Sequence, residues 1–251
     1  MRKAQFFYLL RRGLLSGGLN FIKEGLVMFN KFTTAGLNFP AQGSAEFNGT
    51  SDYVQLPDPF SHTNHTIAAW VYLDAAAFST IFDNRDANDV GIRLLVNDSN
   101  VLFYQLNSSD RTHTLSLNDW IFVAASYDGT TQKLYADGSL VSSVATSQTI
   151  SVSTYDSNIG KSTYENNYFG GNLANVAIWN RALSSDEINS VMWKSYEGLE
   201  GAESNGLQAW YSLDDITSPA ASLANMEQLA TDKNATIENK AAITAAINAL
   251  S

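Results

Sequence analysis

The sequence has no cysteine, only four prolines, and charged side chains at just 16% of its 251 positions. Without cysteine it can form neither a disulfide framework nor a thiolate metal site, so packing alone must hold the fold together. It also lacks any apolar run of the ~20 residues that a membrane-spanning helix needs. Hydrophobic residues make up 45% of the chain, and Gly, Ser, Thr and Asn are plentiful. This composition is typical of many short strands joined by tight turns.

Strand and turn signals follow one another regularly between residues 39 and 180. The segment 65–73 alternates along two faces, as a strand does. Asp-Gly pairs at 128–129 and 137–138 are the strongest hairpin signals in the chain. Strands at this spacing predict an all-β fold, an antiparallel β-sandwich or jelly roll.

A strand at residues 173–179 is followed at once by a helix signal. Ser184 and Glu187 have the spacing of a capping box, in which the serine hydroxyl binds a free amide and the glutamate reaches back. Ile188 and Val191 then fall at helical spacing, so we expect a short capped helix packed on the sheet.

The chain divides by pattern into three parts: an N-terminal arm at 1–37, a sandwich at 38–217 and a C-terminal extension at 218–251. We expect helix in both terminal parts, because apolar residues recur there at helical spacing. These residues are Leu19, Ile22, Leu26 and Phe29 in the arm, and Ile243, Ile247 and Leu250 in the extension.

Charge is distributed unevenly, with +5 on residues 1–40 and −15 on the remainder. An acidic body repels phosphate, so we expect it not to bind nucleic acid. The arm is basic and apolar, but Arg11-Arg12 interrupt its first apolar run and no small-x-small cleavage site follows. Such an arm favours docking on a partner protein over export, and the alternative is that its apolar stripe covers an edge of the chain's own sandwich.

Five segments, in order along residues 38–196, resemble the motif series of laminin-G-like, concanavalin A-like jelly rolls, and the last is also similar to that of pentraxins. They read FNGTSDYVQLP, TIAAWVYLD, WIFVAASYDGTTQKLYADGSLV, NIGKS and FGGNLANVAIWNRALSSDEI. The resemblance implies the sandwich fold. It does not decide function, because this fold is used by enzymes, lectins and scaffolds.

Catalysis of glycoside hydrolysis needs two carboxylates about 5–10 Å apart. The glucanases that this chain resembles use a Glu-x-Asp-x-Glu pattern, which the sequence does not contain. We therefore expect a protein that is not an enzyme.

The densest set of oxygen ligands is in the loop FDNRDANDV, where Asp83, Asp86 and Asp89 could hold Ca²⁺. The resemblance to pentraxins places an Asp-Asn pair of their calcium site in this loop. The alternative is that these aspartates only solvate a turn. No other cofactor is expected.

Sugar binding without calcium needs exposed aromatic rings beside amides and acids. Tyr164, Asn166, Asn167 and Tyr168 form such a set, and packing within a turn is the alternative for each of them. We expect any glycan site at these two loops, on the rim of the sandwich.

The function that these features favour is a structural protein of a bacteriophage virion, a capsid decoration or tail-associated protein. Its arm would dock on a capsid or tail protein, and the sandwich would form a homo-oligomer that can meet a cell-surface glycan. The alternative is a secreted bacterial, carbohydrate-binding, lectin-like module. The docking residues expected in the arm are Arg2, Lys3, Phe6, Phe7, Leu10, Arg11 and Arg12.

Overall fold

The computed structural model describes the backbone of residues 31–33, 36–38, 44–56, 60, 62–86, 88–147 and 156–213, and the side chains of all of these from residue 44 on except that of Glu197. The chain forms two compact units, residues 1–38 and 39–251. In the first unit, strands β1 (Lys31–Thr33) and β2 (Gly36–Asn38) pair antiparallel. The predicted helices of the arm and the extension lie outside the described residues, as do all the predicted docking residues.

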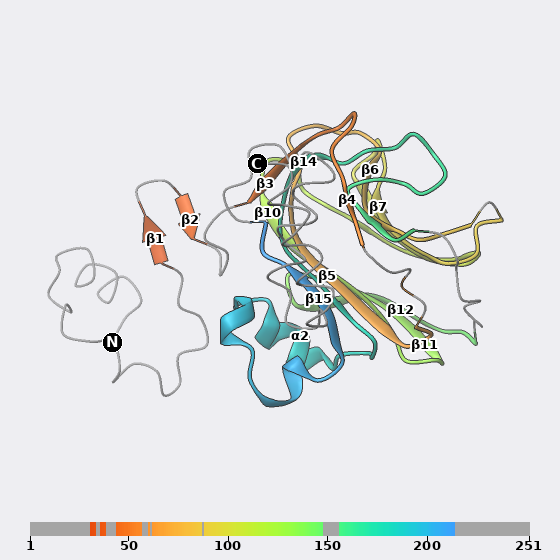
Figure 1. Cartoon of the computed structure of the whole chain (residues 1–251), viewed down its shortest axis with the longest axis vertical. Coiled ribbons are helices and arrows are strands. Elements are labelled where there is room, and N and C mark those ends of the chain that lie inside the picture. The colour runs from red at the N-terminus through yellow and green to blue at the C-terminus, as the bar shows by residue number, and fades with distance from the viewer. Residues whose placement is uncertain are drawn as a thin grey trace, which may run out of the picture. The chain divides into compact units, whose positions relative to one another are not determined.

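The second unit contains two antiparallel sheets (Figure 1). The larger has seven strands in the described part: β3 (Ala45–Asn48), β5 (His65–Tyr72), β10 (Trp120–Tyr127), β11 (Thr131–Ala136), β12 (Ser139–Ala145), β14 (Gly170–Trp179) and β15 (Leu207–Tyr211). The smaller has six: β4 (Val54–Gln55), β6 (Ser79–Asp83), β7 (Ile92–Val96), β8 (Val101–Leu106), β9 (Ser109–Thr114) and β13 (Asn158–Ile159).

Neighbouring strands in each sheet are often far apart in sequence. The described path through the larger sheet is β12-β11-β10-β5-β14-β15, with β3 paired to β14, and the smaller sheet runs β4-β13-β6-β7-β8-β9. The two Asp-Gly hairpins join β10 to β11 and β11 to β12, as the sequence predicts. The prediction of an antiparallel jelly-roll sandwich is confirmed.

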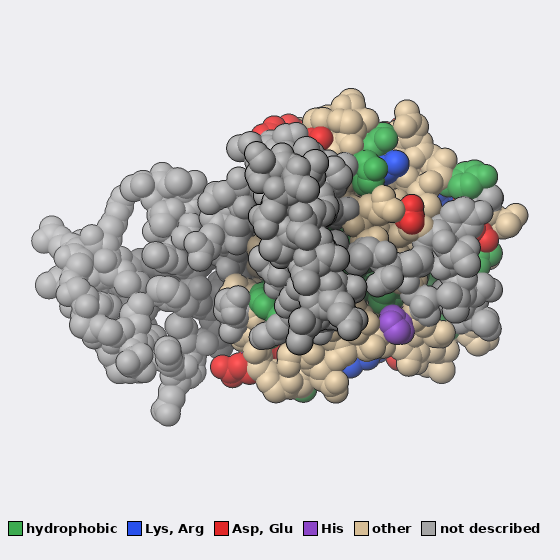
Figure 2. All heavy atoms as spheres, in the orientation of Figure 1, with side chains coloured by type: hydrophobic (Ala, Val, Ile, Leu, Met, Phe, Trp, Pro, Cys, Tyr) green, Lys and Arg blue, Asp and Glu red, His purple; other side chains and the backbone are tan. Residues whose placement is uncertain are grey.

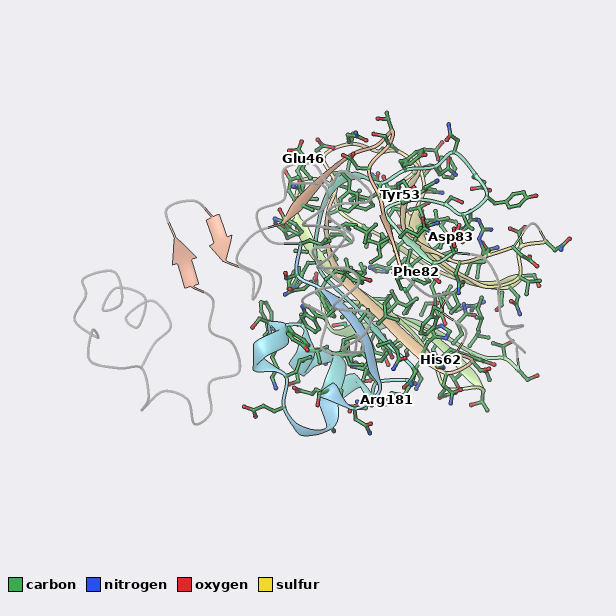
Figure 3. The ribbon with its side chains drawn as sticks, in the orientation of Figure 1. Glu46, Tyr53, His62, Phe82, Asp83 and Arg181 are labelled. Carbon is green, nitrogen blue, oxygen red and sulfur yellow. The ribbon has the colours of Figure 1, made fainter. Side chains whose placement is uncertain are left out.

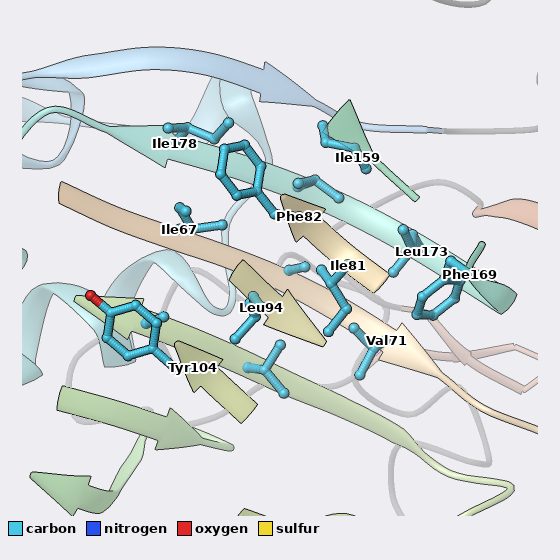
Figure 4. Packing of buried hydrophobic residues seen from close by; sticks show 14 of the residues in the cluster. Ile67, Val71, Ile81, Phe82, Leu94, Tyr104, Ile159, Phe169, Leu173 and Ile178 are labelled. Atoms are coloured by element: carbon cyan, nitrogen blue, oxygen red, sulfur yellow. The ribbon is translucent and has the colours of Figure 1, made fainter. Parts of the chain in front are cut away.

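The main core lies between the two sheets (Figure 4). Ile67, Leu173 and Ile178 come from the larger sheet, and Phe82 and Leu94 come from the smaller one; all five are fully buried. Alternation along each strand sends every second side chain into this layer. The positions in between therefore form the outer faces of the sandwich.

The outer face of the larger sheet carries a second apolar cluster under helix α2 (Ser185–Val191) and the short helices η2 (Tyr196–Gly198) and η3 (Gly201–Ser204). The predicted capping box is present, because the Ser184 hydroxyl accepts a hydrogen bond from the Glu187 amide and Glu187 binds the Ser184 amide. Trp70 and Trp179 lie beneath, and their ring nitrogens donate to the carbonyls of Met192 and Glu203.

Helices α2 and η2 contribute residues to this cluster, and η3 contacts it through the hydrogen bond from Trp179 to the Glu203 carbonyl. In the part of the chain that the structure describes, no helix is long and apolar enough to cross a membrane.

Candidate functional site

A row of six polar side chains crosses the whole outer face of the smaller sheet, one from each strand. Directly paired residues of antiparallel strands point to the same side of a sheet. The pairs Gln55–Asn158, Asn158–Asp83, Asp83–Arg93, Arg93–Gln105 and Gln105–Asp110 join β4, β13, β6, β7, β8 and β9 in turn. We call these six residues the polar row.

The neighbours of the polar row along each strand show that it faces away from the core. Ile159, Phe82 and Leu94 each stand one position from a member of the row and belong to the core cluster. Between Thr80 and Phe82 the register of β6 shifts, and this irregularity brings Asp83 into line with Arg93. Figure 3 shows Phe82 and Asp83 next to each other in this sheet, with Arg181 near the helices at the other end of the body.

Asp83, at the end of β6, is fully buried and forms an ion pair with Arg85. The Asp83 Oδ1 atom accepts hydrogen bonds from the Arg85 amide at 2.9 Å and from Arg85 Nε at 3.2 Å. Its Oδ2 atom accepts from Arg85 Nη2 at 3.2 Å and from the Ser162 hydroxyl at 2.9 Å. Both carboxylate oxygens of Asp83 are therefore engaged within the protein.

The other two aspartates of the predicted calcium site each bind a different partner within the protein. The Asp89 carboxylate, 66% exposed, pairs with Arg85 Nη1. The Asp86 carboxylate accepts hydrogen bonds from the Asn88 and Val90 amides, and the bond from Val90 is the main cause that lowers the pKa of Asp86.

These contacts do not fit a calcium site. The Arg85 guanidinium already occupies the position between Asp83 and Asp89, so a metal cation placed there would meet a like charge. Among the described residues, no three His, Asp or Glu side chains are grouped so as to hold a metal ion.

Gln105 joins two arginines in the middle of the polar row. Its Oε1 atom accepts hydrogen bonds from Arg85 Nη1 at 3.2 Å and from Arg93 Nε at 3.1 Å. Arg93 Nη1 in turn lies 2.9 Å from Glu165 Oε2, which also accepts from the Asn167 amide at 2.7 Å. The network thus connects the loop after β6 with the loop after β13.

The 161–168 loop is held at both ends and at its centre. An isolated bridge pairs Lys161 with Tyr168, and the Ser162 amide donates to the Asn167 carbonyl at 2.8 Å. The Ser162 hydroxyl, while donating to Asp83, accepts from the Glu165 amide at 3.1 Å. Such bonds fix the backbone on either side of Tyr164.

Tyr164 extends from this loop with 61% of its surface exposed, one of the few large apolar side chains in the described residues to be so exposed. Asn166 is exposed and Asn167 half-buried beside it. Tyr168 packs against Tyr53 at a ring-centroid distance of 6.5 Å, and the Lys161 ammonium lies 4.4 Å from the centre of the Tyr53 ring. The four predicted ligand residues therefore share one loop, with Tyr164 exposed and Tyr168 packed.

Two polar atoms beside Asp83 have unused hydrogen-bonding capacity. Asn158 Oδ1 and Thr163 Oγ1 are buried and have no hydrogen-bond partner among the described residues. Asn158 is the register partner of Asp83, and the Thr163 amide approaches Asp83 Oδ2 at 3.4 Å. Either atom can accept a hydrogen bond from a hydroxyl group.

The charged members of the row affect one another. Burial raises the pKa of Asp110, although the positive charges of Arg93, Arg111 and Arg85 lower it. Burial also lowers the pKa of Arg93, and the neighbouring Arg85 lowers it further, whereas the Glu165 carboxylate raises it. Figure 2 shows that charged side chains are sparse on one face of the described surface, in keeping with the low charge of the sequence.

The two loops were predicted from the sequence as the place of any glycan site, but the strand residues between them were not. Arg93 and Gln105 are the residues that link the loops. Each is a polar residue inside an otherwise apolar strand, a signal that was present in the sequence. Tyr53, Lys161 and Asp110 carried no such local signal.

Two stacked antiparallel sheets with non-sequential strand order define an all-β jelly-roll sandwich. The chain belongs to the concanavalin A-like lectin/glucanases superfamily: the Laminin_G_3 family matches residues 48–189, more than half of the sequence. No curated protein is significantly similar to it in sequence.

Solved structures share the fold at low sequence identity. A candidate carbohydrate-binding protein from Bacteroides ovatus superposes with a TM-score of 0.57 and 19% identity over 70% of this chain, which spans only 52% of that protein. The CBM40 domain of a Ruminococcus gnavus sialidase, bound to α2,3-sialyllactose, superposes with a TM-score of 0.51 and 15% identity. The match covers 62% of this chain and the whole of that domain. A heptameric pentraxin from Limulus polyphemus superposes with a TM-score of 0.48 and 18% identity, over 69% of this chain and 86% of the pentraxin chain.

Proposed function

We propose that this protein binds carbohydrate, without catalysing a reaction, on the outer face of the smaller sheet beside the 161–168 loop. The observation that carries the proposal is Tyr164, an aromatic side chain 61% exposed on a loop that Asp83 and Arg93 hold through Ser162 and Glu165. Because the backbone on either side of Tyr164 is held, its ring can stack on the apolar face of a sugar without the cost of ordering the loop.

The groups around Tyr164 supply the polar contacts that sugar hydroxyls require. Asn166 and Asn167 offer amides, Asp89 and Glu165 offer carboxylate oxygens, and the polar row continues beneath them. The superfamily and the carbohydrate-binding proteins of the same fold support this reading.

The proposal is tested by a glycan array with the purified chain, followed by titration of the strongest binder. Tyr164→Ala should weaken binding by about tenfold or more, because truncating an aromatic residue at the centre of a contact costs on the order of 1–2 kcal/mol or more. Tyr164→Phe should retain most of the affinity, since the ring remains.

Leu140→Ala is the matched control, because Leu140 is 51% exposed on β12, in the other sheet. Equal loss in both variants would point to general adhesion. An array without any binder, with Tyr164→Ala folded and unchanged, would exclude carbohydrate binding. Turnover of a β-glucan or sialoside panel would refute the non-enzymatic part of the proposal.

A second proposal concerns where the protein acts. The basic, apolar sequence of residues 1–37 before an acidic body favours docking on a bacteriophage capsid or tail protein, and a homo-oligomeric sandwich displayed on the virion. The alternative is secretion by a bacterium. Deletion of residues 1–36 should leave a folded sandwich that no longer joins particles, whereas a mature N-terminus near residue 37 in culture medium would favour secretion. Light scattering measures the oligomeric state.

A further inference from the structure

The exposed charges at the proposed sugar site are carboxylates, while the arginines that hold them are covered. The Asp89 side chain is 66% exposed and its partner Arg85 only 2%. The Glu165 side chain is 47% exposed and its partner Arg93 only 15%. A ligand that reaches the outer ends of these ion pairs therefore meets carboxylates and not guanidinium groups.

The two ion pairs are arranged around one glutamine. Because Gln105 Oε1 accepts from both arginines, Arg85 and Arg93 converge on it, and each directs a carboxylate toward the surface. The amide nitrogen of Gln105 makes no hydrogen bond to any described residue, so it remains available as a donor. The group thus offers two carboxylate acceptors and one amide donor, which are the kinds of partner that sugar hydroxyls bind.

Asp110 adds a third exposed carboxylate at the β9 end of the polar row. No salt bridge to Asp110 is formed in the described part of the chain. The Debye length is about 8 Å at physiological ionic strength, so carboxylates this close to the ligand are incompletely screened.

We propose that the site selects neutral glycans and rejects acidic ones. The inference rests on the proposed function and names its ligand class. Sugar hydroxyls donate to Asp89 and Glu165, whereas the carboxylate or sulfate of an acidic sugar meets those same groups as like charges and cannot donate to them.

Lys161, at the start of the 161–168 loop, is one cation that could oppose this selection. Its ammonium lies over the rings of Tyr53 and Tyr168, at 4.4 and 5.7 Å from their centres. These contacts direct its charge to phenol rings and not to the Arg85–Gln105–Arg93 group. A Lys161→Met variant separates its contribution from that of the two carboxylates.

The experiment measures the full chain against matched glycan pairs that differ by one acidic group, beginning with lactose and 3′-sialyllactose and extending to sulfated and uronic acid pairs. In each pair that binds, the neutral member should bind about tenfold tighter or more. The ratio of the two dissociation constants, acidic over neutral, should grow at low salt, where like charges are less screened. Glu165→Gln should reduce the ratio, because it removes one surface carboxylate and leaves the Arg93 charge unpaired.

Asp98→Asn is the matched control, since it removes an exposed carboxylate from the turn between β7 and β8 and should leave the ratio unchanged. Equal or tighter binding of the acidic members overturns the selection while carbohydrate binding stands. If that preference disappears in Lys161→Met, the lysine and not the arginine network controls charge recognition. Failure of both members of every pair to bind removes the proposed function itself.

Discussion

The Asp83 carboxylate and the Arg85 guanidinium form an ion pair in which the side chains are 0% and 2% exposed. Arg85 thereby takes the place that a bound cation would have beside Asp83, and it connects this carboxylate to Gln105 and Asp89. Burying an ion pair costs several kcal/mol per ion in lost hydration, which is offset only when the remaining hydrogen bonds are made. Here the Ser162 hydroxyl makes one of them, so the pair also fixes the 161–168 loop.

Arg85→Met should lower the free energy of unfolding by about 3–5 kcal/mol, because it leaves the Asp83 charge buried without its partner. Urea denaturation measures the change. Asp83→Asn/Arg85→Met removes both charges and keeps an acceptor for Ser162, so it should regain most of the loss. A single variant as stable as the natural chain would show that the pair contributes nothing.

Acid should destabilise the sandwich through His65. This side chain is fully buried, with Nδ1 donating to the Thr63 carbonyl at 2.9 Å and Nε2 accepting from the Tyr104 hydroxyl at 2.7 Å. Burial lowers the pKa of His65 from 6.5 to about 4. The neutral imidazole is thus the folded form, and its contribution is complete above pH 6.5 and lost as the pH falls through 4.

The loss attributable to His65 should amount to about 3 kcal/mol across this window. His65→Gln should flatten the dependence of stability on pH between 6.5 and 4, measured as the urea midpoint at each pH. His113→Gln, in the edge strand β9, is the control and should leave the slope as it is. An unaltered slope in His65→Gln would contradict this assignment.

Gly171 is required by a close approach of β14 to β5. Its φ is +127°, and a Cβ atom there would lie 2.2 Å from the Tyr72 carbonyl oxygen. Gly171→Ala should lower the free energy of unfolding by about 2–5 kcal/mol, because it adds an unfavourable backbone conformation to a steric overlap. Gly201, at φ +53° with nothing within 4 Å of its Cβ position, is the matched control. Gly201→Ala should lower the free energy of unfolding by about 1 kcal/mol, because only the strained backbone conformation contributes. Similar Tm values for the two variants would refute the steric explanation.

The capping box should contribute measurably to stability. Ser184→Ala removes the hydroxyl that accepts from the Glu187 amide at 3.2 Å, and should lower the free energy of unfolding by about 1 kcal/mol. Ser116→Ala, the control, changes an exposed serine that makes no hydrogen bond to a described residue. It should change the free energy of unfolding by less than about 0.5 kcal/mol. Equal effects of the two substitutions would show that the cap is dispensable.

The local structure of the sandwich was predictable from sequence because its signals are short in range. An Asp-Gly pair adopts a hairpin turn whatever lies elsewhere, and both such pairs join consecutive strands here. The capping box at Ser184 depends on residues three apart. Alternation along each strand is equally local, since it follows from the pleat.

The site was predictable only in part. The sequence located the loop aspartates and the Tyr164 loop, but it assigned Asp83 to a metal or to solvent, whereas the structure buries it against Arg85. Arg85, the charged partner of Asp83, is only two residues away in the sequence. Whether that side chain turns back to Asp83 depends on how the carboxylate is held, and one of the groups that hold it is Ser162, far along the chain.

By itself, the sequence determined most of the strands, the turns, the capped helix and the superfamily, whereas β6 and β9 were not predicted. Only the tertiary structure decided that Gln55, Asn158, Asp83, Arg93, Gln105 and Asp110 form one row. That row depends on β13 inserting between β4 and β6, and on the register of five strand pairs. Register is set by which apolar faces meet in the core, and a shift of one residue would turn each of these side chains inward. No local pattern contains that information, because the pairing energy arises between segments up to about a hundred residues apart.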